Sequence, residues 1–170
     1  MRHTGVAAEN VGLHAVLATV LAWRRVCQAS ALPRSPSARA VFGMTYDPAG
    51  GRIVLVGGRI ATSASSDETW VYAGGAWTLL VSATSPGERG NAALAYAPSR
   101  RTLVLFGGWD WTGDRHLADT WVLDGDSWRE EIHAPAPPAR YGNGLATLGD
   151  GVLLFGGYEG DHLGDTWLHD

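Results

Sequence analysis

The chain has 170 residues, 45% of them hydrophobic and 18% charged, with a net charge of -4. This length suits one domain of ordinary composition, and the acidic balance argues against nucleic-acid binding. All 13 cationic residues are Arg, which excludes chemistry that needs a Schiff-base or phosphate-binding lysine. Cys27 is the single cysteine, so neither an intramolecular disulfide nor a multi-cysteine metal site can form.

Residues 1–36 come first and allow three interpretations. Asn10 could cap a helix, because apolar residues follow it at spacings of three and four. Arg2 could begin a signal peptide, since an apolar stretch and a segment of small residues resembling a cleavage site follow it. Trp23 could instead begin the last strand of a preceding repeat. The compartment therefore stays open between secreted and cytoplasmic, and no interpretation provides a transmembrane span.

From residue 37 onward the sequence repeats one order of landmarks three times, over 37–85, 86–136 and 137–170. Each copy has an Arg, a short apolar stretch, a turn, four apolar residues, a Gly-Gly doublet, a variable loop, and an Asp with Trp close behind. The first two doublets end at Gly58 and Gly108, which are 50 positions apart. The third doublet ends 49 positions after Gly108. A period near 50 built from strand-sized pieces indicates a repeat architecture, in which each unit needs its neighbours to bury its faces.

Each copy is predicted to form short antiparallel strands. Gly74 and Gly75 are a strong signal for a two-residue hairpin turn. The apolar residues before each doublet form a continuous run, which is typical of a strand covered on both faces. The third copy is predicted to have only its first three strands. The predicted strands of the first two copies are residues 41–46, 53–56, 69–72 and 76–80, and then 92–96, 102–106, 120–124 and 127–130.

The hairpin turns predict where the tryptophans lie. If Gly125 and Asp126 are the two loop residues, Leu123 lies opposite Trp128, and Trp121 shares their face. The first copy repeats this arrangement around its own turn. Large aromatic faces that recur once per sheet suit sheet-on-sheet stacking around an axis, so we expect these residues to pack in the core.

These features resemble the bacterial Kelch-repeat β-propeller family and, within it, the central domain of galactose oxidase. The family pattern places apolar residues before Gly-Gly and two spaced aromatic residues after it. Trp70 and Trp77 meet this pattern in the first copy, Trp121 and Trp128 in the second, and Trp167 meets it in part in the third. The resemblance implies an all-β fold of four-stranded antiparallel Kelch-type blades, with two full blades plus a partial third after a short N-terminal segment that could be helical.

Two blades and part of a third do not close a ring, since propellers have about four to eight blades. Either the sequence is a piece of a longer reading frame, or several chains associate, or open sheet edges and aromatic faces remain exposed. We therefore expect self-association or additional blades to cover the open edges.

Function is predicted at one end of the blades. The loops that join the second strand to the third, and each blade to the next, lie at the same end and differ between copies. The resemblance implies a non-enzymatic binding or scaffold module with no cofactor, which would recognise a protein partner there, or a glycan. Trp109 and Trp111 could instead pack over neighbouring blades. The candidate partner-binding residues are Trp109, Asp110, Trp111, Asp114, Arg115, His116, Tyr158, Glu159, Asp161 and His162.

The alternative function is a fragment of a carbohydrate-active Kelch protein, either glycan-binding or similar to galactose oxidase or sialic acid isomerase. Cys27 lies outside the repeats, which argues against the Tyr–Cys crosslink that the copper oxidases require. No catalytic or metal site is predicted, because one His among scattered carboxylates is weak evidence for metal binding. Charges that recur in every copy are instead expected to pair at the blade ends. These charges are Arg39, Arg89 and Arg140 with Asp67, Asp119 and Asp165.

Overall fold

A computed structural model describes residues 35–170. The described strands all belong to one compact unit, Pro33–Asp170. Within the described residues all regular structure is β, and none of it is a helix long and apolar enough to cross a membrane. The helix, signal peptide and strand interpretations of the N-terminal segment concern residues that lie outside the described range.

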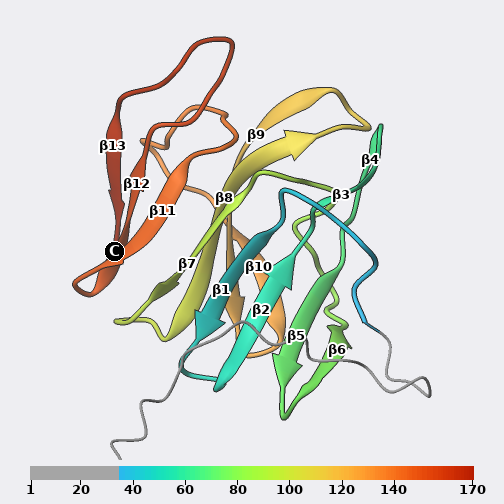
Figure 1. The fold of residues 1–170 in the computed structure, drawn as a ribbon. Helices are drawn as coiled ribbons and strands as arrows, with labels where there is room; N and C mark the ends of the chain where they lie inside the picture. Colours follow the sequence, from blue (N-terminus) through green and yellow to red (C-terminus); the bar gives the residue numbers. More distant parts are fainter. Residues whose placement is uncertain (1–34) are drawn as a thin grey trace, which may run out of the picture. The chain divides into compact units, whose positions relative to one another are not determined.

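The strands form two four-stranded antiparallel sheets and one of three strands (Figure 1). A separate hairpin follows the first doublet. This is the predicted all-β fold, with two full blades and a partial third. The first sheet has the order β1 (Gly43–Asp47), β2 (Arg52–Val56), β5 (Thr69–Ala73), β6 (Ala76–Leu80). The second contains β7 (Ala93–Ala97), β8 (Thr102–Asp110), β9 (Arg115–Asp124) and β10 (Ser127–Glu131), and the third β11 (Gly144–Leu148), β12 (Gly151–Phe155) and β13 (Thr166–His169). The hairpin is β3 (Arg59–Ala61) with β4 (Ala64–Ser65).

The two central strands of the second blade are longer than the sequence predicted. Strand β8 continues past its glycine doublet to Asp110, and β9 already begins at Arg115. The register shifts between Phe106 and Gly108, which marks a bulge that carries the pairing past the glycines. The prediction of a loop over this segment was therefore wrong: the segment is a paired ribbon that ends in a tight turn.

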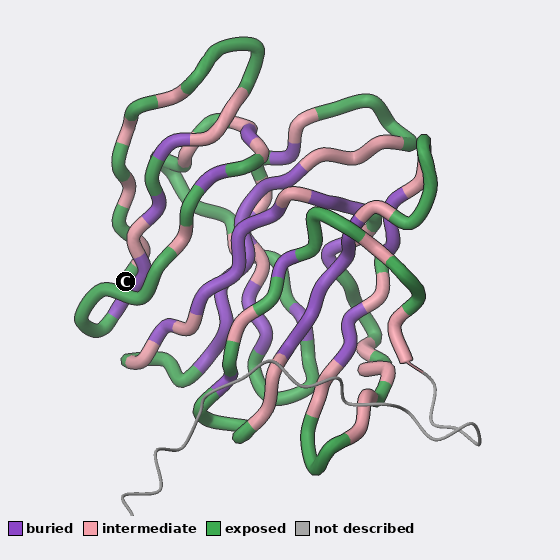
Figure 2. Tube along the Cα trace, viewed as in Figure 1, coloured by how far each residue is buried: buried purple, intermediate pink, exposed green. Residues whose placement is uncertain are grey.

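Two clusters of buried apolar side chains hold the blades against one another. Strand β8 serves both, because its alternate residues point to opposite faces. Leu103 and Leu105 pack toward the first blade, and Val104 packs toward the third. Figure 2 shows the buried residues concentrated in the middle of the sheets. The apolar runs of the first two blades are thus buried on both faces, as predicted, whereas Phe155 at the end of the third run is exposed.

The tryptophans take equivalent places in the three sheets. Trp70, Trp121 and Trp167 pair with Leu55, Leu105 and Leu154 of the neighbouring strand in their own blades. The predicted partner of Trp128 is also confirmed, since it pairs with Leu123 across the turn. Trp128 is only 3% exposed, and its indole Nε1 donates a hydrogen bond to Thr69 Oγ1 of the first blade at 3.0 Å. The indole therefore adds a polar link to the apolar contact between blades.

Glycine doublets allow the next blade to approach closely. A Cβ at Gly57 would lie 2.3 Å from the carbonyl oxygen of Arg89, and one at Gly107 would lie 2.5 Å from that of Arg140. The second glycine of the first doublet, Gly58, donates its N–H to the same Arg89 oxygen at 2.9 Å. Both first glycines also have positive φ, of 65° and 67°, which side-chain-bearing residues rarely adopt.

Each outer face of the stack carries exposed apolar side chains. Met44 and Tyr46 are more than half exposed on the face of the first sheet turned away from the second. Phe155 and Leu168 are more than half exposed on the far face of the third sheet. Self-association or further blades would cover exposed apolar surface of this kind, and this stays a prediction.

Candidate functional site

The recurring charges form a structural network in the second blade. The Arg89 guanidinium donates to both Asp119 carboxylate oxygens, at 2.9 and 2.7 Å, and to the Gly107 carbonyl at 3.0 Å. Trp121 Nε1 donates to the same carboxylate at 2.7 Å. Burial raises the pKa of Asp119, but the hydrogen bonds and charge of Arg89 outweigh it, so that the pKa is lowered. The carboxylate is therefore held charged by partners that occupy both its oxygens.

Equivalent networks occur in the other two blades, with one correction. Arg140 binds both oxygens of Asp165, at 2.5 and 2.8 Å, as predicted. Arg39 instead binds Glu68 at 2.6 Å, so the prediction that Asp67 would be its partner was wrong. The position of the paired carboxylate is set by the tryptophan two residues after it. In the first blade this is Trp70, whose Nε1 also donates to the Glu68 carboxylate. Glu68 has that spacing, and Asp67 is exposed. These charges are thus occupied in holding the fold.

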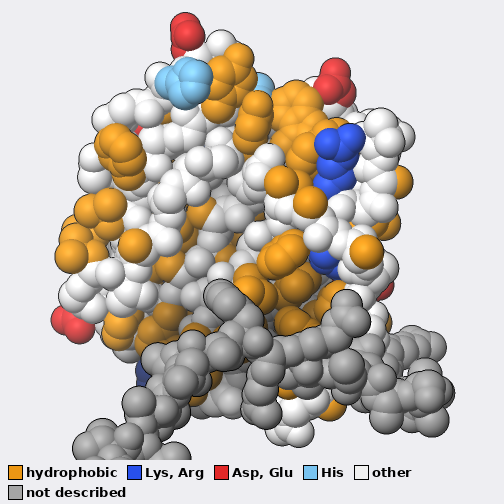
Figure 3. Space-filling model, in the orientation of Figure 1, with side chains coloured by type: hydrophobic (Ala, Val, Ile, Leu, Met, Phe, Trp, Pro, Cys, Tyr) orange, Lys and Arg blue, Asp and Glu red, His pale blue; other side chains and the backbone are white. Residues whose placement is uncertain are grey.

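A different set of side chains meets at the long-loop end. Six aromatic and His rings form a continuous row, which we call the rim row. Its members are Trp111, Trp109, His116, Tyr141, Tyr158 and His162. Figure 3 shows hydrophobic and His side chains gathered over these loops, at the top of the view. The row begins on the ribbon of the second blade and ends on the loop of the third.

Contacts within the rim row are close and mostly edge-to-face. The centroids of Trp109 and His116 lie 4.6 Å apart, and those of Trp109 and Tyr141 lie 5.6 Å apart. His116 stacks on Tyr141 at 5.4 Å with an angle of 14° between their planes. Tyr158 follows at 5.5 Å from Tyr141, and His162 at 5.5 Å from Tyr158. Each ring therefore packs against at least one other ring of the row.

The first blade contributes the start of the row. The Arg59 guanidinium lies 5.6 Å from the Trp111 ring centre, within the range of a cation–π contact. The Trp111 ring also touches Gly90, where a Cβ would lie 2.6 Å from a ring carbon. Trp111 therefore does pack over a neighbouring blade, while it remains half-exposed.

Charged residues around the row have two roles. Asp110 accepts hydrogen bonds from the backbone N–H groups of Thr112 and Gly113, at 3.0 and 2.8 Å, and from Arg115 Nε at 3.1 Å. The backbone bond from Gly113 is the main cause of its lowered pKa. Asp110 and Arg115 thus shape the turn that presents the tryptophans. Three other acidic candidates are exposed around the row: Asp114, Glu159 and Asp161.

The sequence missed Tyr141, which lies at the centre of the row. Its signal was a comparison of equivalent positions in the three copies. Tyr141 follows the recurring Arg and forms an isolated bridge with Tyr158, as Gly90 does with Trp109. Two copies have a small residue after the Arg and the third has Tyr, so this position varies together with the long loops.

The stacked antiparallel sheets have the architecture of β-propeller blades. In its sequence, the chain is similar to an F-box/kelch-repeat protein of Arabidopsis thaliana, with 39% identity over 75 residues. The match covers 39% of this chain and spans about 15% of the length of that curated relative. It supports a Kelch-repeat relationship, and it supports neither a bacterial origin nor a specific likeness to galactose oxidase. No protein family profile matches the chain.

Proposed function

We propose that this chain is a non-enzymatic Kelch-repeat module that binds a protein partner through the rim row. Kelch repeats commonly bind proteins, and the row lies where the repeats differ most. The observation that carries the proposal is the continuity of six rings over the end of adjacent blades. A repeated scaffold that presents variable loops at one end is a common design for recognition.

The rim row has the composition of a protein-binding anchor. Trp, Tyr and Arg dominate the residues that contribute most to interfaces, and rigid rings lose little conformational entropy on binding. Arg59 and the half-buried rings provide this set, and Asp114, Glu159 and Asp161 provide a charged surround. An apolar centre within a polar border is typical of interfaces between proteins.

The geometry favours a polypeptide over a sugar. A sugar ring stacks on the open face of an aromatic ring, whereas here the rings of Trp109, His116 and Tyr141 cover one another. Among the described residues, His116 Nε2 is buried and has no hydrogen-bond partner. Because this nitrogen is enclosed by the neighbouring rings, His116 contributes to the row by packing.

A matched pair of charge reversals tests where the partner binds. Asp161→Arg changes the rim, and Asp150→Arg changes an exposed turn at the opposite end of the blades. Interacting proteins are captured with immobilised chain and identified by mass spectrometry for the wild type and both variants. We expect a partner that is retained by Asp150→Arg and lost with Asp161→Arg. A protein partner that is lost equally with both variants would contradict the proposal. Capture of glycans alone, with no protein partner, would contradict it as well.

Two further variants separate binding from packing. Trp109→Ala and Trp111→Ala should each abolish capture of that partner while the protein stays folded by circular dichroism. Gly90→Ala replaces no aromatic residue, but its new methyl group displaces the Trp111 ring, so it should weaken capture of the partner. Extensive unfolding of both tryptophan variants would instead assign these side chains to packing alone.

A further inference from the structure

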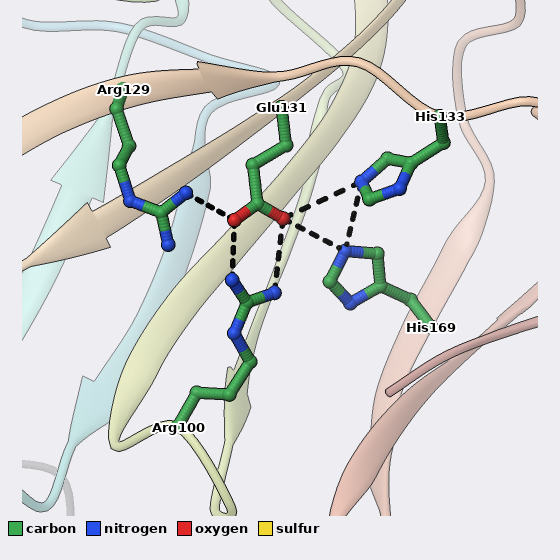
Figure 4. Close-up of polar contacts among 5 residues, drawn as sticks. All are labelled: Arg100, Arg129, Glu131, His133 and His169. Carbon is green, nitrogen blue, oxygen red and sulfur yellow. Dashed lines mark hydrogen bonds and ion pairs between the residues drawn. The ribbon is translucent and has the colours of Figure 1, made fainter.

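Three potential metal ligands converge between the second and third blades, away from the rim row (Figure 4). Nε2 of His133 lies 3.3 Å from Nε2 of His169. Glu131 Oε2 lies 3.4 Å from the His133 nitrogen and 3.3 Å from the His169 nitrogen. The three atoms therefore form a nearly equilateral triangle.

These ligands come from separate parts of the fold. Glu131 is the last residue of β10, His133 follows it in the segment that leads to the third blade, and His169 ends β13. Because Glu131 and His169 are 38 positions apart, no local spacing in the sequence revealed the cluster. The Glu131 side chain is only 9% exposed, and His133 and His169 also line a cavity beside Trp167.

We propose that Glu131, His133 and His169 bind a zinc ion that links the third blade to the second. Two imidazole nitrogens and one carboxylate oxygen are ligands that zinc accepts. Bonds of roughly 2.0–2.1 Å in a tetrahedral arrangement place ligand atoms about 3.3–3.4 Å apart, which is the spacing found here. Three protein ligands leave the fourth position to a small ligand such as water.

Two arginines also contact Glu131 and must be reconciled with a cation. Arg100 donates to Oε2 at 3.0 Å, and Arg100 and Arg129 both pair with Oε1. Burial raises the pKa of Glu131, but the hydrogen bonds from these arginines outweigh it and lower the pKa to about 2. Both Glu131 oxygens therefore already have cationic partners, and a bound metal ion would replace part of this positive charge.

The arginines can move away when a metal binds. Arg129 is 47% exposed and Arg100 is 32% exposed, so each can turn its guanidinium toward water. Arg129 binds Oε1 alone, Arg100 binds both oxygens, and Oε2 also faces the two imidazoles (Figure 4). Removing the positive charge of Arg129 should consequently strengthen zinc binding, whereas it would not create binding in a simple hydrogen-bonded cluster.

The test is calorimetric titration of the full chain with zinc, and cobalt(II) replaces zinc to report the coordination geometry by visible absorption. We expect binding of one zinc per chain at this site and the intense visible bands of tetrahedral cobalt. His133→Gln should lower the affinity at least about tenfold, and His162→Gln, which changes an exposed His of the rim row, should leave it unchanged. Arg129→Gln should raise the affinity.

His133 is exposed, so its replacement should leave the fold intact by circular dichroism. His169→Gln provides a second ligand variant with the same expected loss of cobalt absorption. An absence of zinc binding in the folded wild type would overturn the proposal. An equal loss with His133→Gln and His162→Gln would overturn it as well, because it would assign the binding to surface histidines in general.

Discussion

The Arg–carboxylate networks and the segments after the glycine doublets lie on the same blades, but the networks are repeated in every blade whereas the segments differ in their residues. In every blade an Arg binds the carboxylate two residues before a Trp, and in every blade it also binds the carbonyl of the doublet's first glycine. The residue just after the doublet occupies one backbone position in each copy, yet it is Arg59, Trp109 or Tyr158. Uniform contacts maintain the blades, and the residues that vary at fixed positions carry the proposed recognition.

Replacing the buried Arg of a network should have the largest effect on stability. Arg140 is 0% exposed, and Arg140→Met leaves the Gly156 carbonyl and the Asp165 carboxylate without their partner. We expect the free energy of unfolding to fall by about 3 kcal/mol, measured by urea denaturation. Arg115→Met is the matched control in the ribbon of the second blade. Arg115 is 68% exposed, so this change should cost under about 1 kcal/mol. Similar losses in both variants would remove the distinction between the two regions.

Gly57→Ala should have the next largest effect. The added methyl group meets the Arg89 carbonyl and forces the two blades apart, in addition to the cost of a positive φ. Gly74 also has a positive φ, but a methyl group added there would meet no atom within 4 Å, so Gly74→Ala measures the conformational cost alone. We expect about 1 kcal/mol for Gly74→Ala and at least twice that for Gly57→Ala. Equal shifts in thermal unfolding would show that close approach is unimportant.

A smaller effect is expected from the polar link between blades. Thr69→Val keeps the side-chain volume but removes the oxygen that accepts the Trp128 indole hydrogen bond. Because the indole is buried, its unpaired N–H should cost about 1–2 kcal/mol. The change should leave Asp161-dependent partner capture unaffected. Loss of capture at unchanged stability would connect the two regions and weaken the comparison.

The pH dependence of stability should give the smallest and most distributed effect. The pKa of Asp119 is lowered because Arg89 outweighs the opposing effect of burial, and the pKa of Glu68 is lowered chiefly by its hydrogen bond from Arg39. A carboxyl with a lowered folded-state pKa stabilises the fold above its unfolded pKa, and that contribution is lost as the pH falls toward the folded pKa. The free energy of unfolding should therefore decrease from about pH 5 to about pH 2. Asp119→Asn should reduce this decrease, and the exposed Asp150→Asn should not.

The sequence predicted the repeated part of the fold well, because the period and the turn residues are local. Gly125 and Asp126 fix the pairing of Trp128 with Leu123, and the structure has that pairing. The sequence-based prediction failed where two neighbouring acidic residues could each pair with the recurring Arg, as Asp67 and Glu68 could with Arg39 in the first blade. Only the spacing to the following Trp distinguishes them.

The rim row was predicted in part. Sequence analysis identified Trp109 and Tyr158 as candidates because they lie in the variable segments. It missed Tyr141, whose ring lies between theirs, because Tyr141 directly follows a structural Arg. The Glu131, His133 and His169 cluster was invisible for a different reason. Its members meet only when one sheet packs on the next, and no single repeat contains all three.

The backbone of each recurring Arg also has a consequence for how such proteins change over time. Arg89 serves its own blade with its side chain and the preceding blade with its carbonyl, which accepts from Gly58. Arg140 relates to Gly108 in the same manner. One residue thus belongs to two modules, so we expect duplication or deletion to preserve these contacts only when it adds or removes a whole period. Gene rearrangements that break the chain in the variable loops would preserve every such joint.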